Sequence, residues 1–254
     1  MPYAVFFDIL GTSRIFLNIS DEYEFDCPEW ENHNYTKTRR NFHRSLQIAT
    51  EVVPQGLRFI ASFSDCAYLI YDDATSLLLA TGVAMQNFYQ TLVPVRGGIG
   101  YGNFGVDRVV HASSIRSIST EASFFGSALV RAHAAEQCGL KGFRVFVDAS
   151  AGQTLTEKNK EDLAYIDEST MEEGIRAGTA PAIVIQLVGE SALSFVTHEL
   201  SFIGRDHAEL YLRAIDMIEL IFPPDEYALE HYISSRKAIH HFELLRDNFL
   251  SLSS

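Results

Sequence analysis

Short continuous apolar runs and longer amphipathic stretches alternate along this chain, and the two patterns predict different elements. The runs Tyr3–Ile9, Leu57–Phe63 and Cys66–Tyr71 have the length of buried strands and are flanked by turn-forming residues. Only Ser64 and Asp65 separate the last two runs, which is the length of a tight hairpin turn. The sequence therefore predicts one strand followed, further along, by a strand hairpin.

Three longer segments carry apolar residues at helical spacing. Thr36–Val53 has basic residues on one side and apolar residues on another, Ala74–Leu92 is rich in leucine and alanine, and Ser127–Cys138 ends before a glycine. Val95–Gly102 lies between the last two and predicts a strand interrupted by glycines. The residues between this strand and the third helix show no clear periodicity, so they predict no regular element.

The last part of the chain is less regular. Phe143–Val147 and Ala182–Val188 predict strands, and the polar stretch Gly152–Gly178 between them predicts mostly loop. Asp206–Phe249 predicts two helices that are broken at a pair of prolines. Their apolar stripes indicate packing against the body of the protein or against a partner chain.

The order of these elements is strand, helix, hairpin, helix, strand. This is the split βαβ, or ferredoxin-like, arrangement, so the predicted fold class is α+β with a central antiparallel sheet and C-terminal helices. We expect residues 1–150 to form the core. Residues 151–254 would complete the sheet and add the C-terminal helical extension of the same domain.

Composition narrows the classes of function. Apolar residues make up 47% of the 254 residues, and 33 acidic against 20 basic residues give a formal net charge of −13. This balance argues against a nucleic-acid partner and against a membrane partner, because both bind basic surfaces. The three cysteines form no C-x-x-C pair, no apolar run reaches bilayer-spanning length, and the first residues lack a signal-peptide pattern. We therefore expect a cytoplasmic protein; the acidic stretch 21–31 is interpreted as a solvated surface loop.

Two carboxylates stand out as candidate chemistry. Asp8 ends the first predicted strand and Asp65 lies in the hairpin turn, and in a split βαβ sheet these strands are neighbours. Two carboxylates at such a short distance repel each other unless a cation lies between them. A divalent Mn²⁺ or Mg²⁺ ion fits, with the backbone carbonyl of Ile9 as a further ligand. The alternative is that each aspartate is an ordinary turn residue.

The residues after Asp8 suit a phosphate group. Gly11, Thr12 and Ser13 form a turn whose backbone N–H groups can bind an anion, although the pattern is not a Walker A motif. Arg96 begins the glycine-rich strand and can supply positive charge to a polyphosphate, or it can be an ordinary surface arginine.

Four segments together resemble class III nucleotidyl cyclases. Phe7–Gly11 resembles the first metal motif of that family, and Phe63–Ala67 resembles the second. Val95–Gly100 resembles the family's arginine- and glycine-containing strand, and Phe125–His133 takes the place of its dimer-interface helix. The resemblance covers roughly Tyr3–Asp148.

The sequence departs from the family at its selectivity positions. The two places where purine cyclases carry a base-selecting residue correspond to Ala61 and Ser123. The transition-state asparagine and arginine correspond to Val130 and Ala134, and Arg131 is the candidate substitute.

A class III-like chain that keeps the metal pair and lacks the purine selectors is similar to the pyrimidine cyclases of bacterial Pycsar anti-phage defence. The resemblance implies a homodimer with sites at the subunit interface that converts UTP to cyclic UMP and pyrophosphate. In that family reading Asp8 and Asp65 act through Mn²⁺ or Mg²⁺. A cytidylate or purine cyclase is an alternative, and a catalytically degenerate module that binds a nucleotide or a partner is another. A polymerase-palm-like or dinucleotide cyclase is a weaker option.

Overall fold

The computed structural model describes most of the N-terminal half of the chain and parts of the C-terminal half. The described residues are 1–11, 34–112, 118–139, 141–148, 150–152, 154, 163–165, 184–187, 207–226, 228–237 and 239–240. The acidic stretch 21–31, Thr12, Ser13 and most of 152–178 lie outside them.

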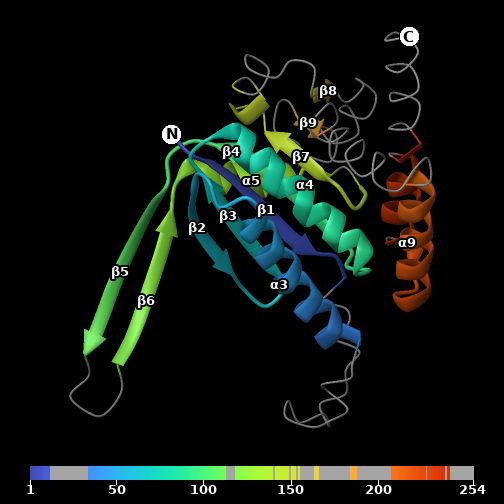
Figure 1. The fold of residues 1–254 in the computed structure, drawn as a ribbon, viewed down its shortest axis with the longest axis horizontal. Coiled ribbons are helices and arrows are strands. Elements are labelled where there is room, and N and C mark those ends of the chain that lie inside the picture. Colours follow the sequence, from blue (N-terminus) through green and yellow to red (C-terminus); the bar gives the residue numbers. More distant parts are fainter. Residues whose placement is uncertain are drawn as a thin grey trace.

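A seven-stranded sheet forms the centre of the molecule (Figure 1). Strand β1 (Tyr3–Ile9) pairs antiparallel with β3 (Cys66–Tyr71) on one side and with β4 (Val95–Tyr101) on the other. The strand order is β2-β3-β1-β4-β7-β9-β8. The remaining strands of this sheet are β2 (Leu57–Ser62), β7 (Val145–Asp148), β8 (Leu163–Tyr165) and β9 (Val184–Leu187).

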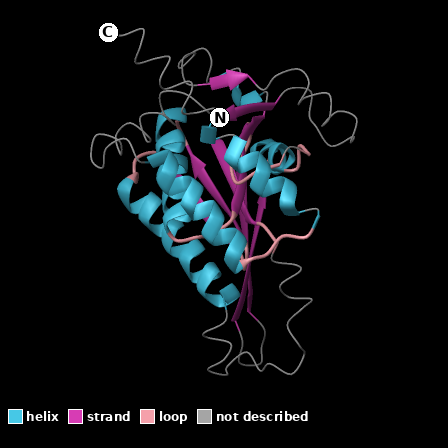
Figure 2. Ribbon diagram, turned by 90° about the vertical axis from the view of Figure 1, so that its right-hand side faces the viewer, coloured by secondary structure: helices cyan, strands magenta, loops and turns pink. Residues whose placement is uncertain are grey.

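Helices cover both faces of the sheet (Figure 2). On one face α3 (Asn34–Val52) and α4 (Ala74–Gln90) pack against the apolar side chains of β1 and β3. On the other face α5 (Ser127–Glu136) packs against β4, β1 and β7. The predicted split βαβ arrangement is therefore confirmed, with the central strands in the order β2-β3-β1-β4.

Glycines on β4 allow helix α5 to lie directly on the strand. A Cβ atom on Gly98 would lie 2.1 Å from the carbonyl oxygen of Ala132, and one on Gly100 would lie 2.5 Å from that of Ala128. No side chain fits in so small a space. The glycines of this strand are therefore explained by packing, because they allow close contact between the helix backbone and the strand backbone.

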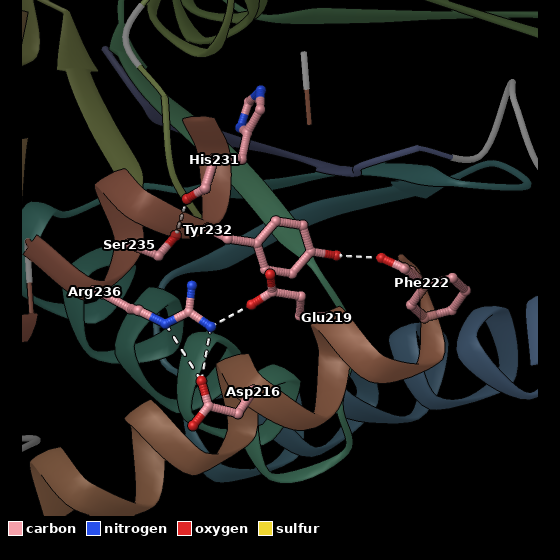
Figure 3. Close-up of polar contacts among 7 residues, drawn as sticks. All are labelled: Asp216, Glu219, Phe222, His231, Tyr232, Ser235 and Arg236. Atoms are coloured by element: carbon pink, nitrogen blue, oxygen red, sulfur yellow. Dashed lines mark hydrogen bonds and ion pairs between the residues drawn. The ribbon is translucent and has the colours of Figure 1, made fainter. Parts of the chain in front are cut away.

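The C-terminal helices pack at one end of the core. Helix α9 (His207–Ile221) and the helical residues 228–237 bury apolar side chains together with Phe143, and Leu10 and Tyr89 border this cluster. Figure 3 shows the polar contacts between the two helices, where Arg236 reaches Asp216 at 2.7 Å and also contacts Glu219.

Some predictions from the pattern were wrong. A second, two-stranded sheet of β5 (Gly105–Ala112) and β6 (Ile118–Phe125) projects from the body (Figure 1), in the region for which no element was predicted. The three-residue strand β8 lies within 152–178, the stretch predicted to be mostly loop, so that prediction is not contradicted. On α3 the apolar residues Phe42, Leu46 and Ala49 are buried, whereas Val52, the last residue of the helix, is 59% exposed.

Among the described residues, no helix has the length and apolar character needed to cross a lipid bilayer.

Candidate functional site

Asp8 lies near the end of β1, on the face of the sheet that α5 covers. Alternate residues of β1 share a face, and Ala4 and Phe6 pack in the cluster that contains residues of α5. In the sheet register Asp8 stands opposite Cys66 on β3 and opposite Arg96 on β4. A carboxylate is therefore held between two neighbouring strands at the border of the core.

Asp65 lies beside this position, in the turn between β2 and β3. The backbone N–H of Ile9 donates to the carbonyl oxygen of Asp65 at 2.9 Å, so the pairing of β1 with β3 continues into the turn. The Ser64 hydroxyl donates to Asp65 Oδ1 at 2.9 Å. The structure thus brings Asp8 and Asp65 together, as the strand order predicted.

The electrostatics of Asp8 reflect this crowding. Burial, and then the negative charges of Glu136 and Asp65, raise the pKa of the Asp8 carboxyl to about 7, although the charge of Arg96 lowers it. An ionised Asp8 is therefore destabilised at neutral pH, and a bound cation would remove that penalty.

The donor set fits a hard divalent ion that keeps other ligands. Among the described residues, no group of three or more histidine, cysteine, aspartate or glutamate side chains is arranged to hold a metal. Magnesium-type ions, however, bind through one or two carboxylates and complete their shell with water and substrate phosphate. Asp8 and Asp65, with the carbonyl of Ile9, meet that requirement.

Arg96 does not lie where a phosphate ligand was predicted. It is 6% exposed, its Nη2 donates to the carbonyl oxygen of Glu136, and its Nε lies 3.6 Å from Glu136 Oε1. The guanidinium also lies over the Phe146 ring, 5.7 Å from its centroid. Arg96 therefore neutralises buried carboxylates inside the protein.

Glu136 was not singled out by the sequence analysis. It is 2% exposed at the end of α5 and its charge acts on Asp8. The available signal was that Glu136 is the one carboxylate in the Ser127–Cys138 segment. A buried lone acid in a helix of small residues needs a cationic partner.

Two residues of α3 near the Asp65 turn were also missed. His43 Nδ1 lies 2.8 Å from the Ser62 hydroxyl, and burial lowers the pKa of His43. Tyr35 is buried, and burial together with the charge of Asp65 raises its pKa. An amphipathic helix pattern alone gives no sign of such contacts.

The remaining candidates lie apart from the carboxylates. Arg131 is exposed on α5, and its Nη1 donates to the carbonyl oxygen of Tyr101 at 2.7 Å. Tyr101 pairs with Tyr3 at the opposite end of β1, about 17 Å along the strand from Asp8. Within one chain, Arg131 and Asp8 therefore do not meet.

The two predicted base-selecting positions differ in environment. Ala61 is buried on β2 opposite Tyr68, on the same face as Asp8. Ser123 is exposed on β6. Gly11 is exposed and has a φ of +82°, a conformation that favours glycine.

No protein-family model and no curated protein sequence matches the chain. Among solved structures, it is similar to the catalytic core of a rhodopsin-guanylyl cyclase with converted specificity in complex with ATPαS, with 13% identity, 74% of this chain and 95% of that chain covered, and a TM-score of 0.47. It is also similar to the guanylyl cyclase Cya2, with 14% identity, 74% and 91% coverage and a TM-score of 0.47. A third is the adenylyl cyclase CyaB from P. aeruginosa, with 12% identity, 74% and 93% coverage and a TM-score of 0.45.

Proposed function

We propose that this protein is a homodimeric nucleotidyl cyclase that converts a pyrimidine nucleoside triphosphate, preferably UTP, to the 3′,5′-cyclic nucleotide and pyrophosphate. The observation that carries the proposal is the juxtaposition of Asp8 and Asp65 at one end of a split βαβ sheet. The motif resemblance of Phe7–Gly11 and Phe63–Ala67 to class III cyclases supports it.

Asp8, Asp65 and the carbonyl of Ile9 would hold one or two Mn²⁺ or Mg²⁺ ions. When bound, such ions make the ribose 3′-hydroxyl more acidic and neutralise charge on the departing pyrophosphate. The 3′-oxygen forms a bond to the α-phosphorus, the bond from that phosphorus to the pyrophosphate oxygen breaks, and the hydroxyl proton is released to solvent. Because the attack is intramolecular, positioning by the protein contributes much of the rate.

Positive charge and backbone amides would complete the polyphosphate site. Gly11, Thr12 and Ser13 would contribute N–H groups after the strand end. Arg96 would contribute by offsetting the charge of Glu136 beneath the site, because its guanidinium already contacts that residue.

The choice of a pyrimidine rests on Ala61 and Ser123. Neither side chain offers the charged hydrogen-bonding group that the family uses to read a purine edge. A buried alanine at position 61 leaves only an apolar contact for the base. We propose UTP, with CTP and purine triphosphates as alternatives, and a role in anti-phage signalling follows from the resemblance to the Pycsar cyclases.

A homodimer would account for the position of Arg131. The side chain lies far from Asp8 of its own chain, so it would act at the site of a second subunit. Exposed apolar side chains near α5, namely Val130 at 69% and Phe125 at 57%, support burial of this surface between subunits.

The test is product formation. The full chain is incubated with each of the four ribonucleoside triphosphates and Mn²⁺, or Mg²⁺, and cyclic products are identified by mass spectrometry. We expect cyclic UMP from the wild type. Asp8→Asn and Asp65→Asn should lose several kcal/mol of transition-state stabilisation, about a hundredfold or more in rate.

Asp72→Asn is the matched control, because Asp72 is exposed after β3 and its side chain forms a surface ion pair with Arg58. Its activity should equal that of the wild type. Product formation by Asp65→Asn at the wild-type rate would overturn the proposed site.

A second candidate function is a nucleotide-binding module without turnover. Val130 and Ala134 at the family's transition-state positions favour it. Failure to form product with all four nucleotides, combined with calorimetric binding of one of them, would support this alternative.

A further inference from the structure

His43 connects helix α3 to the turn that carries Asp65. Its Nδ1 atom lies 2.8 Å from the hydroxyl of Ser62, the last residue of β2. Its ring also hydrogen-bonds the backbone of Ser64, and this bond raises the His43 pKa, as donation from the ring to a carbonyl does. The neighbouring Phe42 ring, 5.5 Å away edge-on, is part of the apolar core.

Hydrogen bonds within the turn connect the residues that His43 contacts to the Asp65 carboxylate. Ser64 donates its hydroxyl to Asp65 Oδ1 at 2.9 Å, and the Phe63 N–H donates to the carbonyl oxygen of Cys66 at 2.8 Å. Residues Ser62, Phe63 and Ser64 are all exposed, so little packing holds the turn. The contact from α3 is therefore one side-chain anchor of the turn, and the Phe63 ring, 6.0 Å from the Phe124 ring, is another.

We propose that His43 is a positioning residue that holds the Asp65 carboxylate in place to bind a divalent cation. The inference rests on the proposed function of this site. A ligating carboxylate is oriented by the groups that hydrogen-bond it and its neighbours, and loss of such a partner weakens metal affinity by about 10- to 100-fold. His43 does this through Ser64 and does not itself touch the cation.

Removal of His43 should change metal affinity more than the chemical step. In His43→Ala, the Mn²⁺ concentration for half-maximal activity should rise about 10- to 100-fold. The kcat at saturating Mn²⁺ should stay close to that of the wild type. A general loss of folding would lower kcat at every Mn²⁺ concentration.

The experiment measures Mn²⁺ binding to the full chain by the loss of the free-ion electron paramagnetic resonance signal, alongside the Mn²⁺ dependence of cyclisation. His43→Asn keeps a hydrogen-bonding group where Nδ1 stood and should regain part of the affinity. Ser64→Ala removes only the hydroxyl bond to Asp65, at an exposed turn where the fold tolerates it, and should also weaken Mn²⁺ binding.

Gln47→Ala is the matched control, because Gln47 lies one turn further along α3 and its exposed side chain hydrogen-bonds Glu51, away from the Asp65 turn. It should bind Mn²⁺ like the wild type. Unchanged Mn²⁺ affinity in both His43→Ala and Ser64→Ala would overturn the positioning role while wild-type product formation leaves the cyclase proposal standing. His43-dependent Mn²⁺ binding without any cyclic product would support the positioning role and contradict the cyclase activity. A wild type that binds no Mn²⁺ would overturn both.

Discussion

The two faces of the central sheet are built in different ways. On the face under α3 and α4, large apolar side chains such as Phe7, Leu69 and Phe88 fill the space between sheet and helices. On the face under α5, Gly98 and Gly100 leave almost no space, and the helix backbone lies on the strand. Buried apolar area stabilises the packing of α3 and α4 on the first face. Close contact between backbones stabilises the packing of α5 on the second.

The charged side chains near Asp8 lie on only one of these two faces. Asp8, Arg96 and Glu136 are grouped on the α5 side, at the end of the sheet where the apolar packing stops. A wide apolar layer would have separated these groups from one another. The comparison teaches that Asp8 lies on the thin face, the one under α5, while the thick face, the one under α3 and α4, is filled by apolar side chains.

The largest effect should come from the thick face. Phe88 is 1% exposed and its ring lies 5.4 Å from Phe7 and 5.3 Å from Phe42. Phe88→Ala should lower the free energy of unfolding by about 3–5 kcal/mol, because it leaves a cavity in the core. Urea unfolding measures this, with Leu79→Ala, at a half-exposed position of α4, as the control. A lowered Mn²⁺ affinity in still-folded Phe88→Ala would contradict the separation of the faces.

Substitutions at two adjacent glycines of β4, which lie on opposite faces of the sheet, test this difference directly. In Gly98→Ala the new Cβ would meet backbone atoms of α5 at 2.1 and 2.5 Å, whereas in Gly97→Ala it would meet the Phe6 carbonyl oxygen at 2.8 Å and the Phe7 ring at 3.0 Å. Gly98→Ala should therefore destabilise by about 1–3 kcal/mol through overpacking, and Gly97→Ala by less. Equal losses in urea unfolding would mean that α5 moves freely on the strand.

A buried ionisable group outside both faces provides a pH test. Burial, and then the charges of Arg96, Lys141 and Arg144, lower the pKa of His231 to about 3, and its Nδ1 accepts from the Gly142 N–H at 3.2 Å. The unfolded chain takes up the proton first, so stability is complete above about pH 6.5 and is lost as the pH falls toward 3. At pH 5 the loss should be about 2 kcal/mol.

His231→Asn, which keeps an acceptor for Gly142, should show a weaker decline between pH 7 and pH 5 in urea unfolding. An identical decline in both proteins would assign the acid sensitivity to other groups.

The last effect should have the opposite sign, a gain in stability. Asp8→Asn replaces a carboxyl whose ionised form burial and two neighbouring carboxylates disfavour. With a chelator at pH 8, the variant should therefore be more stable than the wild type, by up to about 4 kcal/mol, because the Asp8 pKa is about 7 in the folded protein and 3.8 in the unfolded chain. Added Mn²⁺ should raise the melting temperature of the wild type and leave that of Asp8→Asn unchanged. A variant less stable than the chelated wild type would contradict the cost assigned to the buried charge.

Local patterns were sufficient to predict the central part of the fold. The order of apolar runs from Tyr3 to Tyr101 corresponds to one compact arrangement of strands and helices, and that order places Asp8 beside the turn of Asp65. The role of these two residues as cation ligands stays a prediction.

Local patterns did not predict features that depend on pairing or docking across the chain. The β5–β6 hairpin contains Asp107, Arg108 and His111, so it lacks the apolar alternation of a half-buried strand. The contact between Arg96 and Glu136 exists only because α5 lies on glycines, and a single sequence gives no measure of that distance. The acidic stretch 21–31 lies outside the described residues.

In the sheet, Asp8 pairs with residues of β3 and β4 that lie far from it in the sequence. Cys66 and Arg96, its neighbours across the sheet, follow it by 58 and 88 residues. A partly folded chain in which only the hairpin has formed therefore lacks the assembled carboxylate pair, and a cation that requires the pair binds only after β1 has joined the hairpin. Such binding stabilises only chains in which these distant segments have already met.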